Sequence, residues 1–237
     1  TPNPKPQTPN PKPQTPLTNQ NFHLIKYKLM EKPQPHKAKL PLYMGVFAHK
    51  SHVAELRQLS LDTVNIVLKQ TPENKVVETD QAKITAEDKS HKIVEDPHVT
   101  TLFVGHKAVP KDKQPLFSGF QEGQKHSVTI YGAAYFPGQL MTGITKIDRT
   151  KIPCDNEFDH MTLITPHLAA KFSNDLLHEV FTKNSKLATA RKLDFNQEEL
   201  KNLEVSVDTA IPVEVKVSKV SGTAYVIIFA NPLTIGT

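Results

Sequence analysis

Two short stretches of the sequence each place a histidine and a threonine one residue apart at the start of an apolar run. Residues 96–103 read DPHVTTLF, with His98 and Thr100, and residues 158–165 read FDHMTLIT, with His160 and Thr162. Side chains alternate between the faces of a β-strand, so the imidazole and the hydroxyl of each stretch share one face. We call these the first and second His-x-Thr motifs.

Hydrolysis of a cyclic phosphodiester needs this combination of groups. One imidazole must be neutral to take a proton from water, and the other must be protonated to give one to the departing oxygen; histidine serves in both forms because its ordinary pKa is about 6.5. The hydroxyls of Thr100 and Thr162 would donate hydrogen bonds to the phosphate oxygens as negative charge builds. This scheme assigns no step to a metal. In the competing interpretation, His98 and His160 are structural residues bonded to neighbouring backbone groups.

Other hydrolase classes lack their patterns. The closest histidine pairings are His49 with His52 and His160 with His167, and no H-E-x-x-H, cysteine pair or carboxylate at ligand spacing completes a zinc site. A serine or cysteine nucleophile has no elbow motif around it.

A non-catalytic RNA-binding module is an alternative from a different class. Such a module displays aromatic platforms among Arg and Lys, whereas this chain has no Trp and no run typical of an RNA-recognition motif. Tyr43, Tyr131 and Tyr135 could stack on a base. Of these, Tyr43 is the one expected to line the same groove as the motifs, as a substrate-binding residue, because LPLYMGV predicts an early strand.

Composition and charge set limits on the function. The 237 residues include 29 Lys and Arg against 24 Asp and Glu, a net charge of +5 that favours a polyanionic partner. The single cysteine, Cys154, cannot form an internal disulfide, which fits an intracellular protein of the cytoplasm or nucleus. No secretory signal is visible, and no window approaches 18 uncharged apolar residues, so no membrane partner is expected.

The chain divides into a Pro-rich linker, residues 1–18, and a globular domain, residues 19–237. The linker repeats TPNPKPQ twice, which favours an extended polyproline conformation. In the domain, strands are predicted at 22–30, 40–48, 98–104 and 160–165, hairpins at 126–147 and 213–229, helices at 51–61 and from Ser173, and a long loop or ragged hairpin at 71–97. The last hairpin is expected to turn near Ser221-Gly222.

This order of elements predicts an α+β fold. Its two halves resemble one another in order: a strand pair, a helix, then a strand. We therefore expect two pseudo-symmetric lobes, each an antiparallel sheet flanked by helices, with the motifs facing each other across a cleft between the lobes.

The paired HVT and HMT motifs resemble those of the two-histidine phosphoesterase superfamily. Within it, IVEDPHVTTLF, PCDNEFDHMTL (153–163) and FSNDLL (172–177) are similar to the C-terminal cyclic phosphodiesterase domain of fungal tRNA ligase, over most of residues 20–230. Thr101 departs from the family pattern, in which an aliphatic residue is more typical. It faces away from the site in the strand assignment, so little consequence is expected.

The resemblance implies that the chain hydrolyses RNA 2′,3′-cyclic phosphate ends to 3′-hydroxyl, 2′-phosphate ends during tRNA exon joining. It implies no cofactor, His160 as general base and His98 as general acid, and a monomer that follows kinase and ligase domains of the same polypeptide. A related activity on another cyclic or 2′,5′-linked nucleotide stays open, because the motifs do not specify the substrate.

Overall fold

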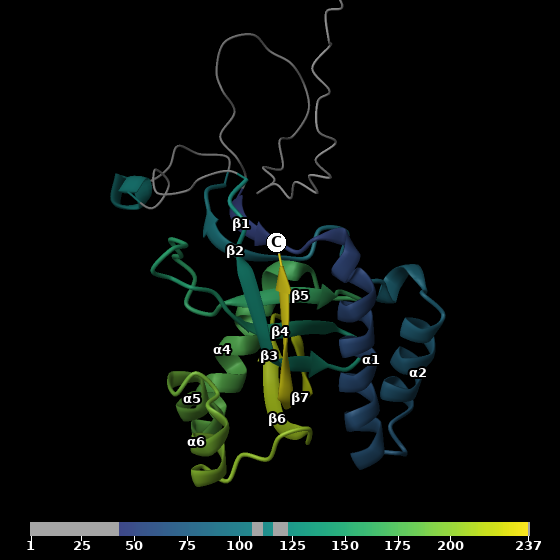
Figure 1. Ribbon diagram of the computed structural model, residues 1–237. Helices are drawn as coiled ribbons and strands as arrows, with labels where there is room; N and C mark the ends of the chain where they lie inside the picture. Colours follow the sequence, from purple (N-terminus) through teal and green to yellow (C-terminus); the bar gives the residue numbers. More distant parts are fainter. Residues whose placement is uncertain (1–42, 106–110, 116–122, 237) are drawn as a thin grey trace, which may run out of the picture.

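Seven strands form one antiparallel sheet in the computed structural model, which describes residues 43–105, 111–115 and 123–236. The strand order is β1-β2-β5-β4-β3-β7-β6 (Figure 1). The strands are β1 Tyr43–Phe47, β2 His98–Phe103, β3 Ser127–Phe136, β4 Leu140–Lys146, β5 His160–Ile164, β6 Ile211–Val217 and β7 Val220–Gly236. Every pairing between neighbours is antiparallel, so side chains at alternate positions reach opposite faces.

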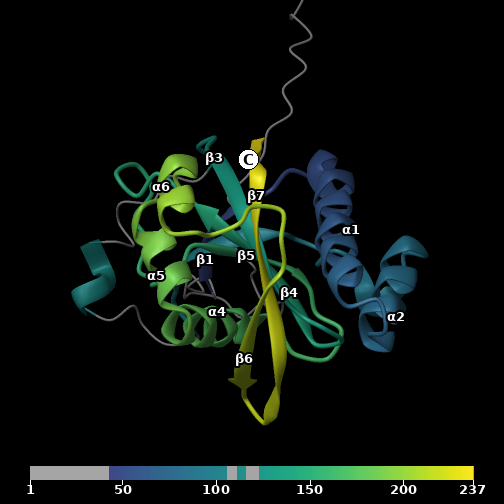
Figure 2. The same cartoon turned by 90° about the horizontal axis from the view of Figure 1, so that it is seen from below.

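Helices cover both faces of this sheet and give the molecule three layers (Figures 1 and 2). The α-helices are α1 Val53–Gln70 and α2 Lys75–Thr85 on one face, and α4 Ser173–Lys183, α5 Ser185–Lys192 and α6 Gln197–Asn202 on the other. Short 3₁₀ helices occur at Lys50–His52, Lys89–His91, Lys111–Lys113 and Ala170–Phe172. None of the described helices is long and apolar enough to cross a membrane.

Each face of the sheet carries its own apolar core. On the first face, Leu56, Val64 and Val67 of α1 pack in one cluster with strand residues that include Val99, Met161 and Ile227. On the second face, Leu176, Leu177 and Val180 of α4 pack in another with Ile144, Val226 and Ile228. Burying apolar area on both sides stabilises the sheet at about 25 cal/mol per Å².

Several elements predicted from the sequence are confirmed. The strands at 98–104 and 160–165 are β2 and β5, and the hairpin at 126–147 is β3 and β4. The helix predicted from Ser173 is α4, and the helix predicted at 51–61 continues to Gln70 as α1. The strand predicted at 22–30 and the linker at 1–18 lie outside the described residues.

The prediction of a loop or hairpin over 71–97 was wrong, because this segment contains α2. The side chain of Asn74 caps the helix by accepting hydrogen bonds from the backbone N–H groups of Val76 and Val77. The helix buries Val77 and Ile84, while most of its other side chains are polar, which hid the helical spacing. Helices α5 and α6 were missed as well, and asparagines cap both in the same way.

The predicted turn of the last hairpin was three residues too late. Val217 pairs with Val220, so the turn is Ser218-Lys219, and Ser218 adopts a left-handed φ of 57°. Gly222 lies inside β7, where a Cβ atom would stand 3.2 Å from Cε2 of Phe136. This glycine therefore permits close packing and does not form the turn.

The two separate sheets expected for two lobes are one continuous sheet. Strands β2 and β5, which carry the two motifs, are direct neighbours in it. The prediction that the histidines lie on different sheets was therefore wrong. The similar order of elements in the two halves of the sequence does not tell whether a strand of one half pairs with a strand of the other, as β2 does with β5.

Candidate functional site

The register between β2 and β5 brings the two motifs together. Val99 of β2 pairs with Met161 of β5, and these are the middle residues of the two motifs. Both side chains belong to the core beneath α1 and α2. The histidines and threonines on either side of this pair therefore all project from the opposite face, the one that carries α4, α5 and α6.

An antiparallel pair has a local two-fold axis, which here passes between Val99 and Met161. If the register of Val99 with Met161 is continued by one residue in each direction, His98 faces Thr162 and Thr100 faces His160. Directly opposed side chains in an antiparallel pair have Cβ atoms about 4.5–5.5 Å apart, with diagonal neighbours about 7–8 Å apart. The two imidazoles thus occupy one diagonal of a small rectangle, and the two hydroxyls the other.

Both histidines are held by the same local hydrogen bond. Nδ1 of His98 lies 2.7 Å from the carbonyl oxygen of Asp96, and Nδ1 of His160 lies 2.9 Å from that of Phe158. A carbonyl oxygen can only accept, so Nδ1 carries a proton in both rings. Nε2 is then the nitrogen that gains or loses a proton during acid–base chemistry.

Burial favours the neutral form of His160. Its side chain is nearly inaccessible, with 6% of the residue exposed. This burial lowers the pKa of His160 below its ordinary value, and the neighbouring His98 lowers it further. The hydrogen bond to Phe158 and the charge of Asp159 oppose the shift without reversing it. A neutral imidazole at neutral pH is suited to accept a proton.

The second motif also contacts the start of α4. Oγ1 of Thr162 lies 2.8 Å from Oγ of Ser173, the first residue of that helix, whose side chain is fully buried. The 3₁₀ helix Ala170–Phe172 runs directly into α4, and the N–H group of Ser173 bonds to the carbonyl oxygen of Ala170. The contact with Ser173 therefore orients the Thr162 hydroxyl, and the start of α4 presents no free N–H group of Ser173 to an anion.

Aromatic rings from β1 pack around the imidazole of His98. The ring centroid of Tyr43 lies 4.7 Å away and that of Phe47 lies 4.8 Å away, and both rings are stacked on the imidazole. Gly45 allows this approach, because a Cβ atom there would lie 3.3 Å from Cδ2 of His98 and 2.8 Å from the carbonyl oxygen of Val99. Burial, with help from Asp96, raises the pKa of the Tyr43 phenol, so its hydroxyl keeps its proton.

Sequence reasoning identified Tyr43 as a neighbour of the motifs but missed Gly45, Phe47, Asn156 and Ser173. Nδ2 of Asn156 donates a hydrogen bond of 2.5 Å to the carbonyl oxygen of Thr100. This bond ties the segment before β5 to the first motif. Asparagines in polar loops are common, and the clearest sequence signal for this one was its place in PCDNEFD, just before the second motif.

Three other residues singled out from the sequence, Thr101, Cys154 and His52, do not lie beside the motif side chains. Thr101 is fully buried on the face beneath α1 and α2, and its hydroxyl has no hydrogen-bond partner among the described residues. Burial raises the pKa of the Cys154 thiol to about 11, with a further rise from Asp159, so the thiol stays protonated. Nδ1 of His52 bonds to Glu55 at 2.6 Å. Within the described ranges, no group of three or more His, Cys, Asp and Glu residues could hold a metal ion.

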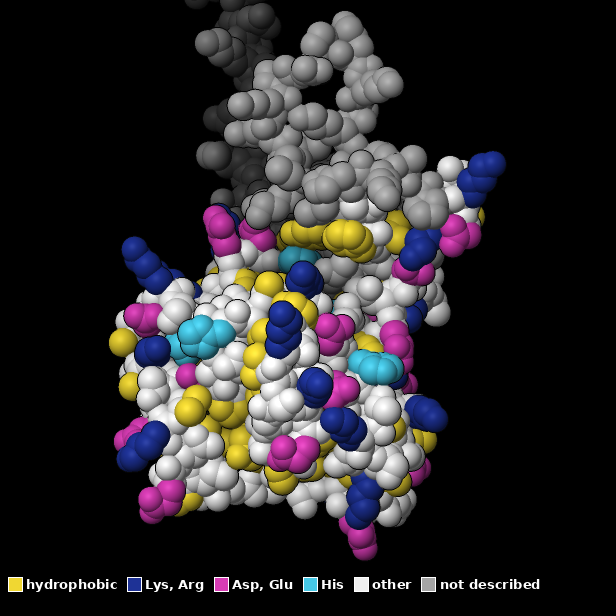
Figure 3. All heavy atoms as spheres, turned by 180° about the vertical axis from the view of Figure 1, so that it is seen from behind, with side chains coloured by type: hydrophobic (Ala, Val, Ile, Leu, Met, Phe, Trp, Pro, Cys, Tyr) yellow, Lys and Arg dark blue, Asp and Glu magenta, His cyan; other side chains and the backbone are white. Residues whose placement is uncertain are grey.

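The positive charge of the chain is concentrated before the described sheet. Residues 1–42 hold seven of the 29 Lys and Arg residues and one of the 24 Asp and Glu residues, which leaves 22 basic and 23 acidic residues for the remainder. Accordingly, the face seen in Figure 3 mixes positive and negative side chains. Attraction of a polyanion to the site itself must therefore come from local donors and dipoles.

Comparisons with known proteins show similarity to solved structures only. No family model matches the chain, and no curated protein matches it. Among solved structures, the chain is similar to the crystal structure of a fungal RNA kinase, with 16% sequence identity and a TM-score of 0.47. The match covers 84% of this chain and 45% of that one, so the chain spans less than half the length of its structural neighbour. This similarity is too weak to assign a family.

Proposed function

We propose that the chain hydrolyses RNA 2′,3′-cyclic phosphate ends to 3′-hydroxyl, 2′-phosphate ends by general acid–base catalysis. The observation that carries this proposal is the β2–β5 register, which gathers two imidazoles and two hydroxyls on one face around the pair Val99–Met161. The bond from each Nδ1 to the carbonyl two residues earlier is one that structural histidines also make. What supports catalysis is the threonine that shares a face with each histidine, together with the register that gathers all four side chains.

In the proposed reaction, Nε2 of His160 takes a proton from a water molecule whose oxygen attacks phosphorus. The bond between phosphorus and O3′ breaks on the opposite side, and Nε2 of His98 gives its proton to O3′. The diagonal placement of the rings suits this in-line attack, because base and acid must stand on either side of phosphorus. The lowered pKa of His160 supports its role as the base.

In this proposal the two threonines stabilise the transition state. Negative charge builds on the two non-bridging phosphate oxygens, and hydroxyl donors fixed on strands need no reorganisation to meet it. The Thr162 hydroxyl is oriented by Ser173, whose Oγ lies 2.8 Å away. It donates to the phosphate when Ser173 is the donor in that bond. Removing one such donor from an active site lowers kcat by about 10²–10³-fold.

The sequence resemblance supports a wider setting for this activity. In the fungal tRNA ligases that the motifs resemble, such a domain heals RNA ends during tRNA splicing beside kinase and ligase domains, and its two motif-bearing halves form two lobes. The Pro-rich residues 1–18 would then be the spacer that follows a kinase domain. Under this proposal, the chain's partners are a tRNA exon end and the rest of its own polypeptide, and no cofactor takes part.

The test is turnover of a short synthetic RNA that ends in a 2′,3′-cyclic phosphate, in the presence of EDTA, with the products separated by chromatography. A 2′-phosphate product, lost in His98→Ala and His160→Ala but kept in the exposed control His167→Ala, supports the proposal. Turnover that EDTA abolishes would indicate a metal-dependent enzyme instead. Binding without turnover would indicate the non-catalytic RNA-binding module.

A further inference from the structure

A second feature on the reacting face is a groove of about 790 Å³ beside the strand that carries His160. Its walls come from the first residues of β3, the end of β4, the segment leading into β5, and the ends of α4 and α5. The residues that matter for its chemistry are Tyr131, Arg149, Phe158, Arg191, Lys192 and Phe195. Its volume lies within the range of about 300–1,000 Å³ typical of small-ligand pockets.

One residue joins this groove to the catalytic base. The carbonyl oxygen of Phe158 accepts the hydrogen bond from Nδ1 of His160, while the Phe158 ring lies in the wall of the groove. That ring stacks on Phe181 with centroids 5.4 Å apart and packs beneath the guanidinium of Arg191 at 4.3 Å. A molecule in the groove would therefore contact the residue whose carbonyl oxygen holds the His160 ring, although none of the four motif side chains lines the groove itself.

Flat surfaces dominate the chemistry of the groove. The half-buried Tyr131 stacks on Phe195 with centroids 5.8 Å apart. The guanidinium of Arg191 lies over Phe158, a planar cation on an aromatic ring. Proteins that bind single-stranded RNA stack unpaired bases on tyrosine rings and on arginine planes of this kind.

The groove is lined by equal numbers of cations and carboxylates, Lys146, Arg149, Arg191 and Lys192 against Asp148, Glu157, Asp159 and Asp194, and most of these charges are paired. Lys146 bonds to Asp194, and Arg149 bonds to Asp159, each at 2.6 Å. The exposed Lys192 is different, because no described carboxylate lies within ion-pair distance of its Nζ. This lysine could contact a phosphate without first giving up a partner.

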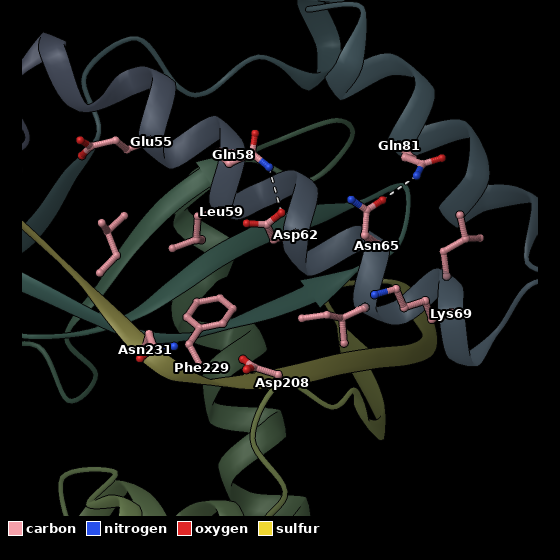
Figure 4. Close-up of a pocket in the computed structure, with 13 residues that line it drawn as sticks. Glu55, Gln58, Leu59, Asp62, Asn65, Lys69, Gln81, Asp208, Phe229 and Asn231 are labelled. Carbon is pink, nitrogen blue, oxygen red and sulfur yellow. Dashed lines mark hydrogen bonds between the residues drawn. The ribbon is translucent and has the colours of Figure 1, made fainter.

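A pocket on the other face of the sheet lacks this chemistry. It lies between α1 and β7, measures about 890 Å³, and is lined by Glu55, Asp62 and Asp208 against the single cation Lys69 (Figure 4). Its one aromatic lining residue is Phe229. With three carboxylates and one lysine, it would repel a phosphodiester chain. Of these two cavities, only the groove beside His160 suits RNA.

We propose that the groove binds the nucleotide that precedes the cyclic-phosphate end of a single-stranded RNA. Its base would stack on Tyr131 and on the guanidinium of Arg191, and its phosphate would contact Lys192. This inference rests on the proposed function, and it makes RNA chains, rather than mononucleoside cyclic phosphates, the preferred substrate class.

The test compares two substrates, a nucleoside 2′,3′-cyclic phosphate and a trinucleotide with the same cyclic-phosphate end. Tyr131→Ala and Arg191→Ala should each lower kcat/KM for the trinucleotide by about 5- to 100-fold, the loss expected for one stacked base, chiefly through KM. Turnover of the mononucleotide should fall far less. Arg191→Lys keeps the positive charge but removes the planar guanidinium on which a base would stack, so it should behave like Arg191→Ala. Lys192→Ala should weaken trinucleotide turnover, whereas Lys69→Ala, an exposed lysine of the other pocket, should not.

Two results would overturn the inference. Equal losses on both substrates would mean that these side chains only support Phe158 and His160, and a wild type without preference for the trinucleotide would mean that the groove binds no second nucleotide. Binding of a fluorescent trinucleotide bearing a 2′-phosphate gives a readout that does not need catalysis. If the wild type turns over neither substrate yet binds this probe through Tyr131 and Arg191, the groove stands and the proposed function fails.

Discussion

Two buried histidines on opposite faces of the sheet are used in different ways. His160 and His91 are similarly inaccessible, with 6% and 4% of each residue exposed. Nδ1 of His160 bonds to the backbone of the segment just before β5, and no hydrogen bond joins its Nε2 to a described side chain. His91 engages both nitrogens, with Nδ1 at 2.7 Å from Oγ of Ser90 and Nε2 at 2.9 Å from Oδ1 of Asp80. Burial alone therefore does not distinguish a structural histidine from one able to exchange a proton.

The network around His91 holds parts of the fold together. Oδ2 of Asp80 accepts hydrogen bonds from the Tyr135 hydroxyl at 2.5 Å and from the backbone N–H of Gly138 at 2.6 Å. These bonds join α2 to the turn between β3 and β4. Burial, followed by the charge of Asp80, raises the pKa of the Tyr135 phenol, so it remains a donor. Burying the Asp80 carboxylate destabilises the fold little while all its partners are present. Removing one partner leaves a buried polar group unpaired and lowers the free energy of unfolding strongly.

The largest expected contrast is in activity. His98→Ala and His160→Ala should each lower kcat for a cyclic-phosphate RNA by about 10²–10⁴-fold, the contribution of a general acid or base. His91→Ala should lower it less than tenfold at a temperature where the variant is folded, because His91 faces the other core. Steady-state kinetics on the three variants, with circular dichroism as the folding control, measures this contrast. Loss of activity in His91→Ala alone would reverse the assignment of the two faces.

Stability should show the opposite ranking. Asp80→Ala should lower the free energy of unfolding by about 3–5 kcal/mol, because it leaves His91 and Tyr135 buried without their partner. The matched control is Asp62→Ala on the exposed side of α1, which should change it by less than about 0.5 kcal/mol. Urea denaturation followed by circular dichroism gives both values. A cost below about 1 kcal/mol for Asp80→Ala would show that the network contributes little.

The pH dependence of the rate sharpens the role of His160. As a base it must be neutral, so protonation at low pH stops the reaction, and burial moves that protonation below its ordinary pKa. The acidic limb of log kcat/KM against pH should therefore have its midpoint below about 6.5. Asp159→Asn removes a charge that raises this pKa, so its midpoint should lie lower still. A wild-type midpoint above about 7 would contradict the assignment of His160 as the base.

The smallest effect is expected at the single cysteine. Because burial raises the pKa of the Cys154 thiol to about 11, the thiolate needed for nucleophilic attack is scarce at neutral pH. Cys154→Ser should keep kcat within about twofold, and a thiol-alkylating reagent should inactivate the wild type only slowly. Rapid inactivation that substrate prevents would place this residue in the reaction.

The motifs and their strands were predictable because the information is local. An imidazole and a hydroxyl two residues apart share a face of any strand, and the apolar residues around His98 and His160 identify the strands. The pairing of β2 with β5 was not predictable, because their middle residues are 62 positions apart and nothing local records which strands become neighbours. The contacts of Thr162 with Ser173 and of Thr100 with Asn156 likewise depend on tertiary structure. Helix α2 was missed because its polar side chains outnumber the few that enter the core.

The pairing of Val99 with Met161 makes the site sensitive to the length of the chain as well as to its residues. Deleting Met161 would put His160 and Thr162 next to one another on opposite faces of β5 and turn one of them into the apolar core, although all four motif side chains would still be encoded. The motif strands also depend on Gly45, which lets β1 approach His98, and on Asn156, which bonds to the carbonyl oxygen of Thr100. A transplant of the motifs to another antiparallel sheet would therefore have to copy this strand alignment together with both neighbours.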